Sequence, residues 1–261
     1  MTFKIKTFLL FLLLGFVFIQ PLYAITTPNA ATLIDIAGKQ RMLSQKIAKS
    51  YFFYGQGIRP EKTNKQMLDS LKLFNKNHEI LKANIKNSDI HDMLLYIEIS
   101  KDELPSIIKA PYSKKNATLM LDYSETLLEA SHDIVKRLEA SSGTKKEKIV
   151  NLSGRQRMLT QRIAKYYIAY QAGFKDKNLI KHLKDAMKEF EAAHKTLGEY
   201  KKNTPEINEE LNKVARLWNV VNKFFSNVEK GGLPVIVLST TDKMMASMNR
   251  VTKLYVNLLG K

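Results

Sequence analysis

The sequence contains no cysteine, which excludes disulfide bonds and thiolate metal sites as supports for the fold. After the first residues it has no apolar run of the roughly 20 residues that a membrane-spanning helix needs, since Leu233–Leu238 is too short. Nucleophile elbows, glycine-rich phosphate loops and paired-carboxylate motifs are also missing. We therefore expect no catalytic residues, no metal and no cofactor, and a protein that is not an enzyme.

Acidic residues are scarce relative to basic ones. The 261 residues include 42 Lys and Arg but only 25 Asp and Glu, which gives a formal net charge of +17. Such a surface favours anionic partners, among them small anions, acidic proteins, lipid headgroups and nucleic acid. No nucleic-acid-binding motif is visible, so we expect no nucleic-acid partner.

The N-terminal segment "MTFKIKTFLLFLLLGFVFIQPLYA", residues 1–24, has the layout of a secretory signal peptide. Lys4 and Lys6 precede an apolar run over 8–19, and Pro21 and Ala24 follow it. We predict cleavage after about Ala24 and a periplasmic protein without a transmembrane span after cleavage. A segment retained as an anchor is the alternative.

One unusual segment occurs twice. "AGKQRMLSQKIAK", residues 37–49, returns as "SGRQRMLTQRIAK", residues 153–165, and twelve of the twenty-two positions in 36–57 are identical in 152–173. At the same offset, Asp69 and His78 match Asp185 and His194, and the agreement resumes near the end of each copy. The chain therefore contains two copies of one unit.

Each unit is predicted to be helical, because apolar residues recur three and four positions apart. Glycine, proline and polar clusters divide the copies into four helices each, at 55–60, 84–88, 110–115, 173–178, 201–205 and 227–234. We predict an all-α fold of two tandem antiparallel four-helix bundles with long first helices, each first helix being the longest of its bundle. The bundles would span 25–143 and 144–261, joined at "EASSGTKKEK", residues 139–148, where a bent continuous helix is the alternative. The sequence leaves open whether they pack against each other or end to end.

The repeated helix carries two stripes at helical spacing. One is the expected core face, made of Ile36, Gln40, Leu43, Ile47, Tyr51 and Tyr54. The other places Arg41 among the small residues Ala37, Ser44, Ala48 and Gly55, and Arg157 among Ser153, Thr160 and Ala164. Lys39 and Lys46 lie on the other flank and are expected to face solvent. Small residues around a long cation indicate the close approach of another helix.

If the two copies pack through these stripes, Arg41 and Arg157 approach each other. Two unit charges about 7 Å apart repel by roughly 2 kcal/mol at an effective dielectric constant near 20, so a negative group should lie between them. A small planar anion held by two guanidinium groups fits. We expect Gln45 and Gln161 to add amide donors, with Ser44 and Thr160 beside them.

The alternative is that each arginine pairs with an acid of its own bundle, such as Asp69 or Asp185. Asp35 is turned about 120° from Arg41 on the same helix, and its counterpart is Asn151, so it is expected to be a poor counter-ion. The repeated His78 and His194 are expected to pack between helices. His132 is not repeated and is expected at the surface.

The segments "IAGKQRMLSQKIAK" and "LSGRQRMLTQRIAK" resemble the signature of the PilJ-type domain, the N-terminal periplasmic module of type IV pilus methyl-accepting chemotaxis transducers, related to the nitrate-sensing domain of NarX-type histidine kinases. The resemblance covers two tandem copies and implies four-helix bundles that sense ligands. In the nitrate-sensing branch the motif arginine binds the anion at a symmetric dimer interface. This role maps onto Arg41 and Arg157, and the motif glycine maps onto Gly38 and Gly154.

Two departures accompany the resemblance. The nitrate-sensing branch has a lysine two residues before the glycine, where this chain has Ile36 and Leu152. Sensors of the family also continue into a membrane span and a signalling domain. We therefore expect a periplasmic binding protein that captures nitrate, nitrite or a carboxylate and reports to a separate membrane sensor or chemoreceptor. The alternative is a structural or adaptor module that binds an envelope protein without a small ligand.

Overall fold

The computed structural model describes residues 28–142 and 146–259, and every regular element within them is helical. The predicted signal peptide, residues 1–24, lies outside the described residues. The first repeat contains α1 (Ala30–Gly55), α2 (Pro60–Asn84), α3 (Ser88–Asp102), α4 (Leu104–Lys109) and α5 (Lys114–Ser142). The second contains α6 (Lys146–Gln171), α7 (Lys177–Gly198), α8 (Pro205–Ser226), the 3₁₀ turn η1 (Val228–Lys230) and α9 (Pro234–Leu259). The all-α prediction is confirmed.

The helix ends follow the local signals in the sequence. Pro60, Pro205 and Pro234 are each the first residue of a helix, where the missing amide proton costs no hydrogen bond. The turn after the motif helix is the same in both repeats, because Gly57 and Gly173 occupy equivalent positions with φ of 68° and 95°. A residue with a side chain is strained in this left-handed region.

Two details differ from the prediction. The third helix of the first repeat is interrupted after Asp102 and restarts as α4, because Pro105 lies in the first turn of the new helix and cannot continue the old one. The expectation that each first helix is the longest of its bundle is wrong for the first repeat, and in the second repeat α6 and α9 have the same length of 26 residues. The longest helix is α5 with 29 residues, whereas α1 and α6 have 26 each.

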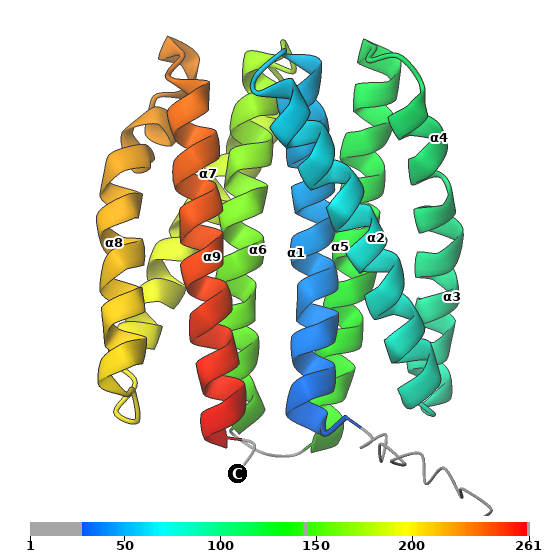
Figure 1. Cartoon of the computed structure of the whole chain (residues 1–261), viewed down its shortest axis with the longest axis vertical. Coiled ribbons are helices and arrows are strands. Elements are labelled where there is room, and N and C mark those ends of the chain that lie inside the picture. Colours follow the sequence, from blue (N-terminus) through cyan, green and yellow to red (C-terminus); the bar gives the residue numbers. More distant parts are fainter. Residues whose placement is uncertain (1–27, 143–145, 260–261) are drawn as a thin grey trace, which may run out of the picture.

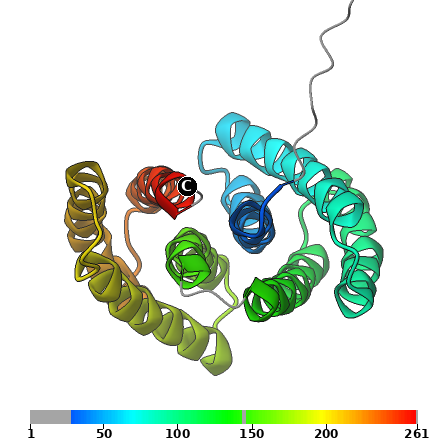
Figure 2. The same ribbon diagram turned by 90° about the horizontal axis from the view of Figure 1, so that it is seen from below.

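The two repeats pack side by side. Figure 2 looks along the helices and shows α1 and α6 next to each other near the middle, with α5 and α9 beside them. Helices α2 and α3 form one outer side, and α7 and α8 form the opposite side. In Figure 1, α1 and α6 run in the same direction, so the repeats are related by a pseudo-twofold axis along the bundle. The motif helices are thereby placed in contact.

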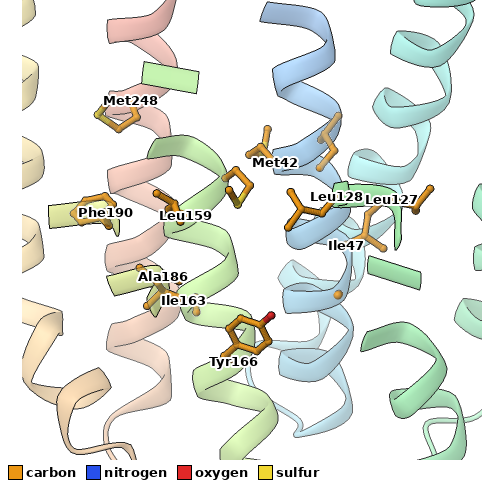
Figure 3. Close-up of a cluster of buried hydrophobic side chains, with 14 of the residues drawn as sticks. Met42, Ile47, Leu127, Leu128, Leu159, Ile163, Tyr166, Ala186, Phe190 and Met248 are labelled. Carbon is orange, nitrogen blue, oxygen red and sulfur yellow. The ribbon is translucent and has the colours of Figure 1, made fainter. Parts of the chain in front are cut away.

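One hydrophobic core extends through both repeats. Figure 3 shows part of it, with Met42 from α1, Leu128 from α5, Leu159 from α6 and Met248 from α9. The core face of α1 is buried as predicted over most of its length, but Tyr54 at its end is 40% exposed. Ala37, Ser44 and Ala48 of the small-residue stripe are buried as well, where α1 packs against α6, whereas Gly55 at its end is only partly buried and lies against Tyr112. None of the described helices combines the length and the apolar character that crossing a membrane requires.

Candidate functional site

The two motif arginines meet where α1 and α6 pack together. Arg41 and Arg157 are each only 1% exposed. A Cβ atom placed on Gly38 would lie 3.3 Å from Nη2 of Arg41 and 3.5 Å from Nη2 of Arg157. On Gly154 the corresponding distances are 3.8 Å and 3.1 Å. The two guanidinium groups therefore lie together against both glycines and occupy the room that side chains at Gly38 and Gly154 would take.

Arg157 is paired with a carboxylate from the other repeat. Its Nη2 lies 2.8 Å from Oδ1 of Asp35, although the N–H bonds of Nη2 do not point at that oxygen. Its Nη1 donates to Oδ1 of Asn249 at 3.0 Å. The expectation that Asp35 is a poor counter-ion is wrong, because the side chain that turns away from Arg41 on α1 turns toward Arg157 on α6. Lys39 contacts the second Asp35 oxygen at 2.8 Å.

Arg41 has neutral direct partners. Its Nη2 donates to Oδ1 of Asn151 at 2.6 Å, and its Nη1 lies 3.2 Å from Nδ1 of His132. Among the carboxylates whose side chains the structure describes, none forms a salt bridge with it. Burial, followed by the nearby charges of Arg155 and Arg157, lowers the pKa of Arg41 to about 9. Glu139, which accepts from Asn151 Nδ2 at 2.8 Å, and Glu189 act in the opposite direction, so Arg41 is a buried cation whose nearest acids act on it without a salt bridge.

Pairing of each arginine with an acid of its own bundle is excluded for the two acids considered. Asp69 is exposed and forms an ion pair with Lys65, and Asp185 is exposed on α7. Among the side chains that the structure describes, Asp35 is the one acid in salt-bridge contact with the arginine pair, and it comes across the repeat interface. The salt bridge of the arginine pair therefore joins the two repeats.

Three N–H-bearing atoms of the pair have no hydrogen-bond partner among the described residues: Nε of Arg41, and Nε and Nη2 of Arg157. An unsatisfied buried polar group costs about 1–3 kcal/mol, and more when it is charged. A polar guest beside the two guanidinium groups would satisfy these donors.

The other predicted site residues lie near the arginines but have partners of their own. Ser44 Oγ donates to the Arg41 carbonyl at 2.9 Å, and Thr160 Oγ1 donates to the Gln156 carbonyl at 2.8 Å. Gln45 Nε2 donates to the Ser124 carbonyl at 2.8 Å, while Gln161 Nε2 lies 3.5 Å from the Thr241 carbonyl. These residues join each motif helix to itself or to the last helix of its own repeat.

A cleft of about 150 Å³ leads from the surface to Arg41. It lies between α1, α5 and α6 and is lined by Arg41, Leu128, Glu129, His132, Arg155, Met158 and Arg162. The pseudo-twofold axis relates it to a cleft of about 380 Å³ between α1, α2 and α9, which contains Lys39, Met42, Lys46 and Asn249. Lys46, which was expected to face solvent, lines this second cleft, and burial lowers its pKa to about 8. Each arginine thus has a cleft beside one of its neutral partners.

A second pair of buried cations joins the repeats further along the motif. Lys49 and Lys165 are repeat equivalents and have no exposed surface. Lys49 Nζ contacts Asp242 Oδ1 at 2.6 Å, and Lys165 forms an ion pair with Glu125. Each lysine therefore binds an acid of the other repeat. The motif consequently supplies cross-repeat ionic contacts at two levels of the interface.

Sequence reasoning missed three members of the site: His132, Asn151 and Asn249. Burial, together with the charges of Arg41 and Arg155, lowers the pKa of His132 to about 4, so its ring is neutral and can accept from Arg41. The only available signal was the alignment of Asp35 with Asn151, both polar and both six residues before an arginine. A helical wheel does not show which helix such residues face.

One further cluster has metal-ligand geometry. His78, Glu79 and Glu98 offer ligand atoms within 4.8 Å of one another. Lys82 donates to both oxygens of Glu98, at 3.0 and 2.8 Å, and burial lowers the pKa of His78. A cation would have to displace Lys82, which disfavours a metal there. The expected packing role fits His78, which is fully buried, and His194, which stacks on Phe190.

Comparison with known proteins identifies one match. The sequence model of the PilJ family, described as type IV pili methyl-accepting chemotaxis transducer N-term, matches residues 27–89 and 140–244. Each matched segment begins just before one of the two motif helices. No curated protein and no solved structure matches the chain.

Proposed function

The chain belongs to the PilJ family of type IV pili methyl-accepting chemotaxis transducer N-terminal domains, and from this premise we propose that it is a sensor module that captures a small anion between its two repeats. Arg41 and Arg157 hold the anion, which is nitrate, nitrite or a small carboxylate. The protein acts in the periplasm after removal of residues 1–24. It reports occupancy to a separate membrane sensor or chemoreceptor.

The observation that carries this proposal is the buried arginine pair with unsatisfied donors. Two guanidinium groups are 1% exposed, adjacent to the same glycines, and three of their N–H-bearing atoms lack hydrogen-bond partners. Planar guanidinium groups match the geometry of carboxylates and planar oxoanions. A bound anion would offset both the repulsion between the cations and the cost of the unsatisfied donors.

The remaining motif residues position the arginines. Gly38 and Gly154 leave the space that the guanidinium groups occupy. Gln45 and Gln161 tie the motif helices to α5 and α9, while Ser44 and Thr160 let the backbones of α1 and α6 approach. Occupancy would be transmitted as a small shift of α1 against α6, because both helices contribute a cation to one guest.

The proposal is tested by ligand-dependent thermal stability. The protein lacking residues 1–24 is melted in nitrate, nitrite, formate, acetate and sulfate, at constant ionic strength against sodium fluoride. At least one anion is expected to raise Tm, because a guest that binds only the folded state adds RT ln(1 + [L]/Kd), about 2.7 kcal/mol at 100 Kd. Arg41→Gln combined with Arg157→Gln should abolish this rise.

The control for that experiment is Arg137→Gln, which removes an arginine from an exposed ion pair with Asp89. It should leave the ligand-induced rise unchanged. The readout is the rise and not the Tm without ligand, because removing buried cations changes basal stability by itself. A wild-type protein whose Tm responds to none of these anions contradicts anion capture.

A second candidate is the adaptor module, favoured by the internal contacts of the arginines with Asp35, Asn151 and Asn249. Such contacts could serve only to join the repeats. In that case an envelope protein would bind stoichiometrically without any small ligand. Affinity capture from envelope extract dialysed free of nitrate, compared between wild type and the double arginine variant, distinguishes the two functions.

A further inference from the structure

The pseudo-twofold axis is broken at one pair of equivalent positions in the site. Asp35 on α1 touches Arg157, and its counterpart Asn151 on α6 touches Arg41. The two contacts are alike in position, 2.8 Å and 2.6 Å from Nη2 of the opposite arginine. They differ in charge, because one partner is a carboxylate and the other is an amide.

This difference gives the two arginines unequal electrostatic surroundings. Charged groups around the arginine pair include Arg155 and Lys39 and the acids Asp35, Glu139 and Glu189, and the cleft beside Arg41 is also lined by Glu129 and Arg162. Arg155 and Glu189 form an ion pair with each other. His132 is neutral, because the neighbouring arginines and its burial depress its pKa. Arg157 thus has a carboxylate in direct contact, whereas the equivalent position beside Arg41 is an uncharged amide.

The difference also determines where in the site an anionic guest is attracted. Asp35 lies against Arg157 and repels a second anion there. On the other side, Arg41 has only amide and imidazole groups as direct partners, and its cleft opens to the surface beside His132. A guest entering that cleft reaches a cation that no carboxylate contacts directly among the described side chains.

We propose that Asp35 acts as a built-in anion that makes the site selective for one singly charged guest, bound off the axis at Arg41. The guest is a small monoanion such as nitrate, nitrite, formate or acetate. Dianions such as sulfate and oxalate are rejected, because Asp35 already supplies one negative charge beside the two arginines. This inference rests on the proposed anion capture and adds its charge class.

The test is the variant Asp35→Asn, in which both arginines face an asparagine. The contact between Arg41 and Asn151 shows that this chain already accommodates such a pair. Wild-type protein should bind nitrate or formate at least about tenfold more tightly than sulfate or oxalate, measured by calorimetry at constant ionic strength. Asp35→Asn should reverse or remove that preference by strengthening dianion binding about tenfold or more.

Asp89→Asn is the matched control. It makes the same change in net charge and removes an acid from an exposed ion pair with Arg137. Its monoanion-to-dianion ratio should equal that of wild type, which separates a local effect from the overall charge. Thermal melting of both variants confirms that they are folded.

Two outcomes overturn the inference while leaving anion capture intact. One is a wild-type protein that binds dianions as tightly as monoanions, and the other is an unchanged ratio in folded Asp35→Asn. If wild-type protein binds no anion of either class, the proposed function fails instead. The two failures are therefore distinguishable in a single set of titrations.

Discussion

At the scale of single residues, the unusual feature is a pair of buried guanidinium groups of which only Arg157 has a carboxylate in direct contact among the described residues. Arginine keeps its charge in nearly all protein environments, so Arg41 and Arg157 remain cations at neutral pH. Asp35 compensates one of them directly, and the other depends on dipoles from His132 and Asn151. This imbalance is the physical basis of the proposed anion binding.

His132 offers a direct probe of that environment. Its ring should titrate with a pKa of about 4 by NMR, well below the ordinary value of 6.5, because of burial and the charges of Arg41 and Arg155. Arg41→Gln should move this pKa upward. Saturation with a bound monoanion should raise it too, because a negative guest beside Arg41 favours the imidazolium. A pKa unchanged by a bound anion would place the guest away from Arg41.

The same shift has a consequence for stability. The unfolded chain protonates His132 at about pH 6.5 and the folded protein only near pH 4, so the unfolded state binds more protons in between. The free energy of unfolding should therefore fall as the pH drops from 6.5 to 4. His132→Gln, which keeps an acceptor for Arg41, should remove part of that fall in urea titrations at pH 7 and pH 4.5.

The sequence predicted the arginines but not the groups that face them. Small residues around Arg41 correctly indicated a close helix neighbour, because helical periodicity reports what lies on one face of a helix. Periodicity does not report which side chain the neighbouring helix presents. Asp35, rejected from its angle to Arg41, and His132, rejected because it is not repeated, were both misjudged for that reason.

At the scale of elements, the motif helix is shaped by its glycine. Gly38 and Gly154 lie inside helices, where glycine costs about 0.5–1 kcal/mol relative to alanine. The contacts of 3.1 to 3.8 Å that a Cβ would make with the arginine nitrogens explain their presence. The intrinsic helix propensity of the motif is thus lowered to make room for the site.

The substitution Gly154→Ala tests whether the glycine lowers helix propensity in order to make room for the arginines. The helix gains propensity, but the new methyl group presses on Nη2 of Arg157 at 3.1 Å, so we expect a stability change within about 1 kcal/mol and a loss of anion affinity of about tenfold. Gly198→Ala is the control, since a Cβ there meets nothing within 4 Å. Urea unfolding and anion titration are measured on both. Equal anion affinity in the two variants would show that the glycine does not shape the guest site.

Helix boundaries were well predicted where glycine or proline marks them, as at Gly57, Pro60, Pro205 and Pro234. The extra break before α4 was missed, although Pro105 was visible, because a proline in a first helical turn and one inside a helix look alike in sequence. The length of α5 was underestimated for another reason. Its polar C-terminal residues look like a linker, and the helix nevertheless continues to Ser142.

At the scale of the whole molecule, motif cations bind acids across the repeat interface. Lys49 pairs with Asp242, Lys165 with Glu125, and Arg157 with Asp35. The acids are not themselves repeat equivalents, so the offset that revealed the duplication could not reveal them. Side-by-side packing, which the sequence left open, is fixed by these pairs together with the shared core.

Glu125 is the acid whose loss tests this interface. Burial alone would raise its pKa, but Lys165 and Arg162 outweigh burial and lower the pKa to about 2. Because this lies below the ordinary value of 4.5, the stabilisation is complete above pH 4.5 and is lost as the pH falls toward 2. Glu125→Gln should cost about 2–3 kcal/mol at pH 7, since it leaves Lys165 and Arg162 without an acid, and should flatten the acid dependence.

The comparison variant is Glu210→Gln, which breaks an ion pair with the half-exposed Arg250. It should cost under about 1 kcal/mol by chemical denaturation at pH 7. Similar costs for the two variants would mean that the cross-repeat pair contributes no more than a surface contact.

Because α1 and α6 belong to one chain, the approach of the two arginines does not depend on the association of two molecules. When two separate subunits form a shared pocket, dilution dissociates the subunits and the pocket is lost. Here both sides of the site belong to one covalent chain. Helix α6 is therefore always present at a fixed effective concentration relative to α1. If the site captures an anion as proposed, its affinity should therefore be independent of the protein concentration.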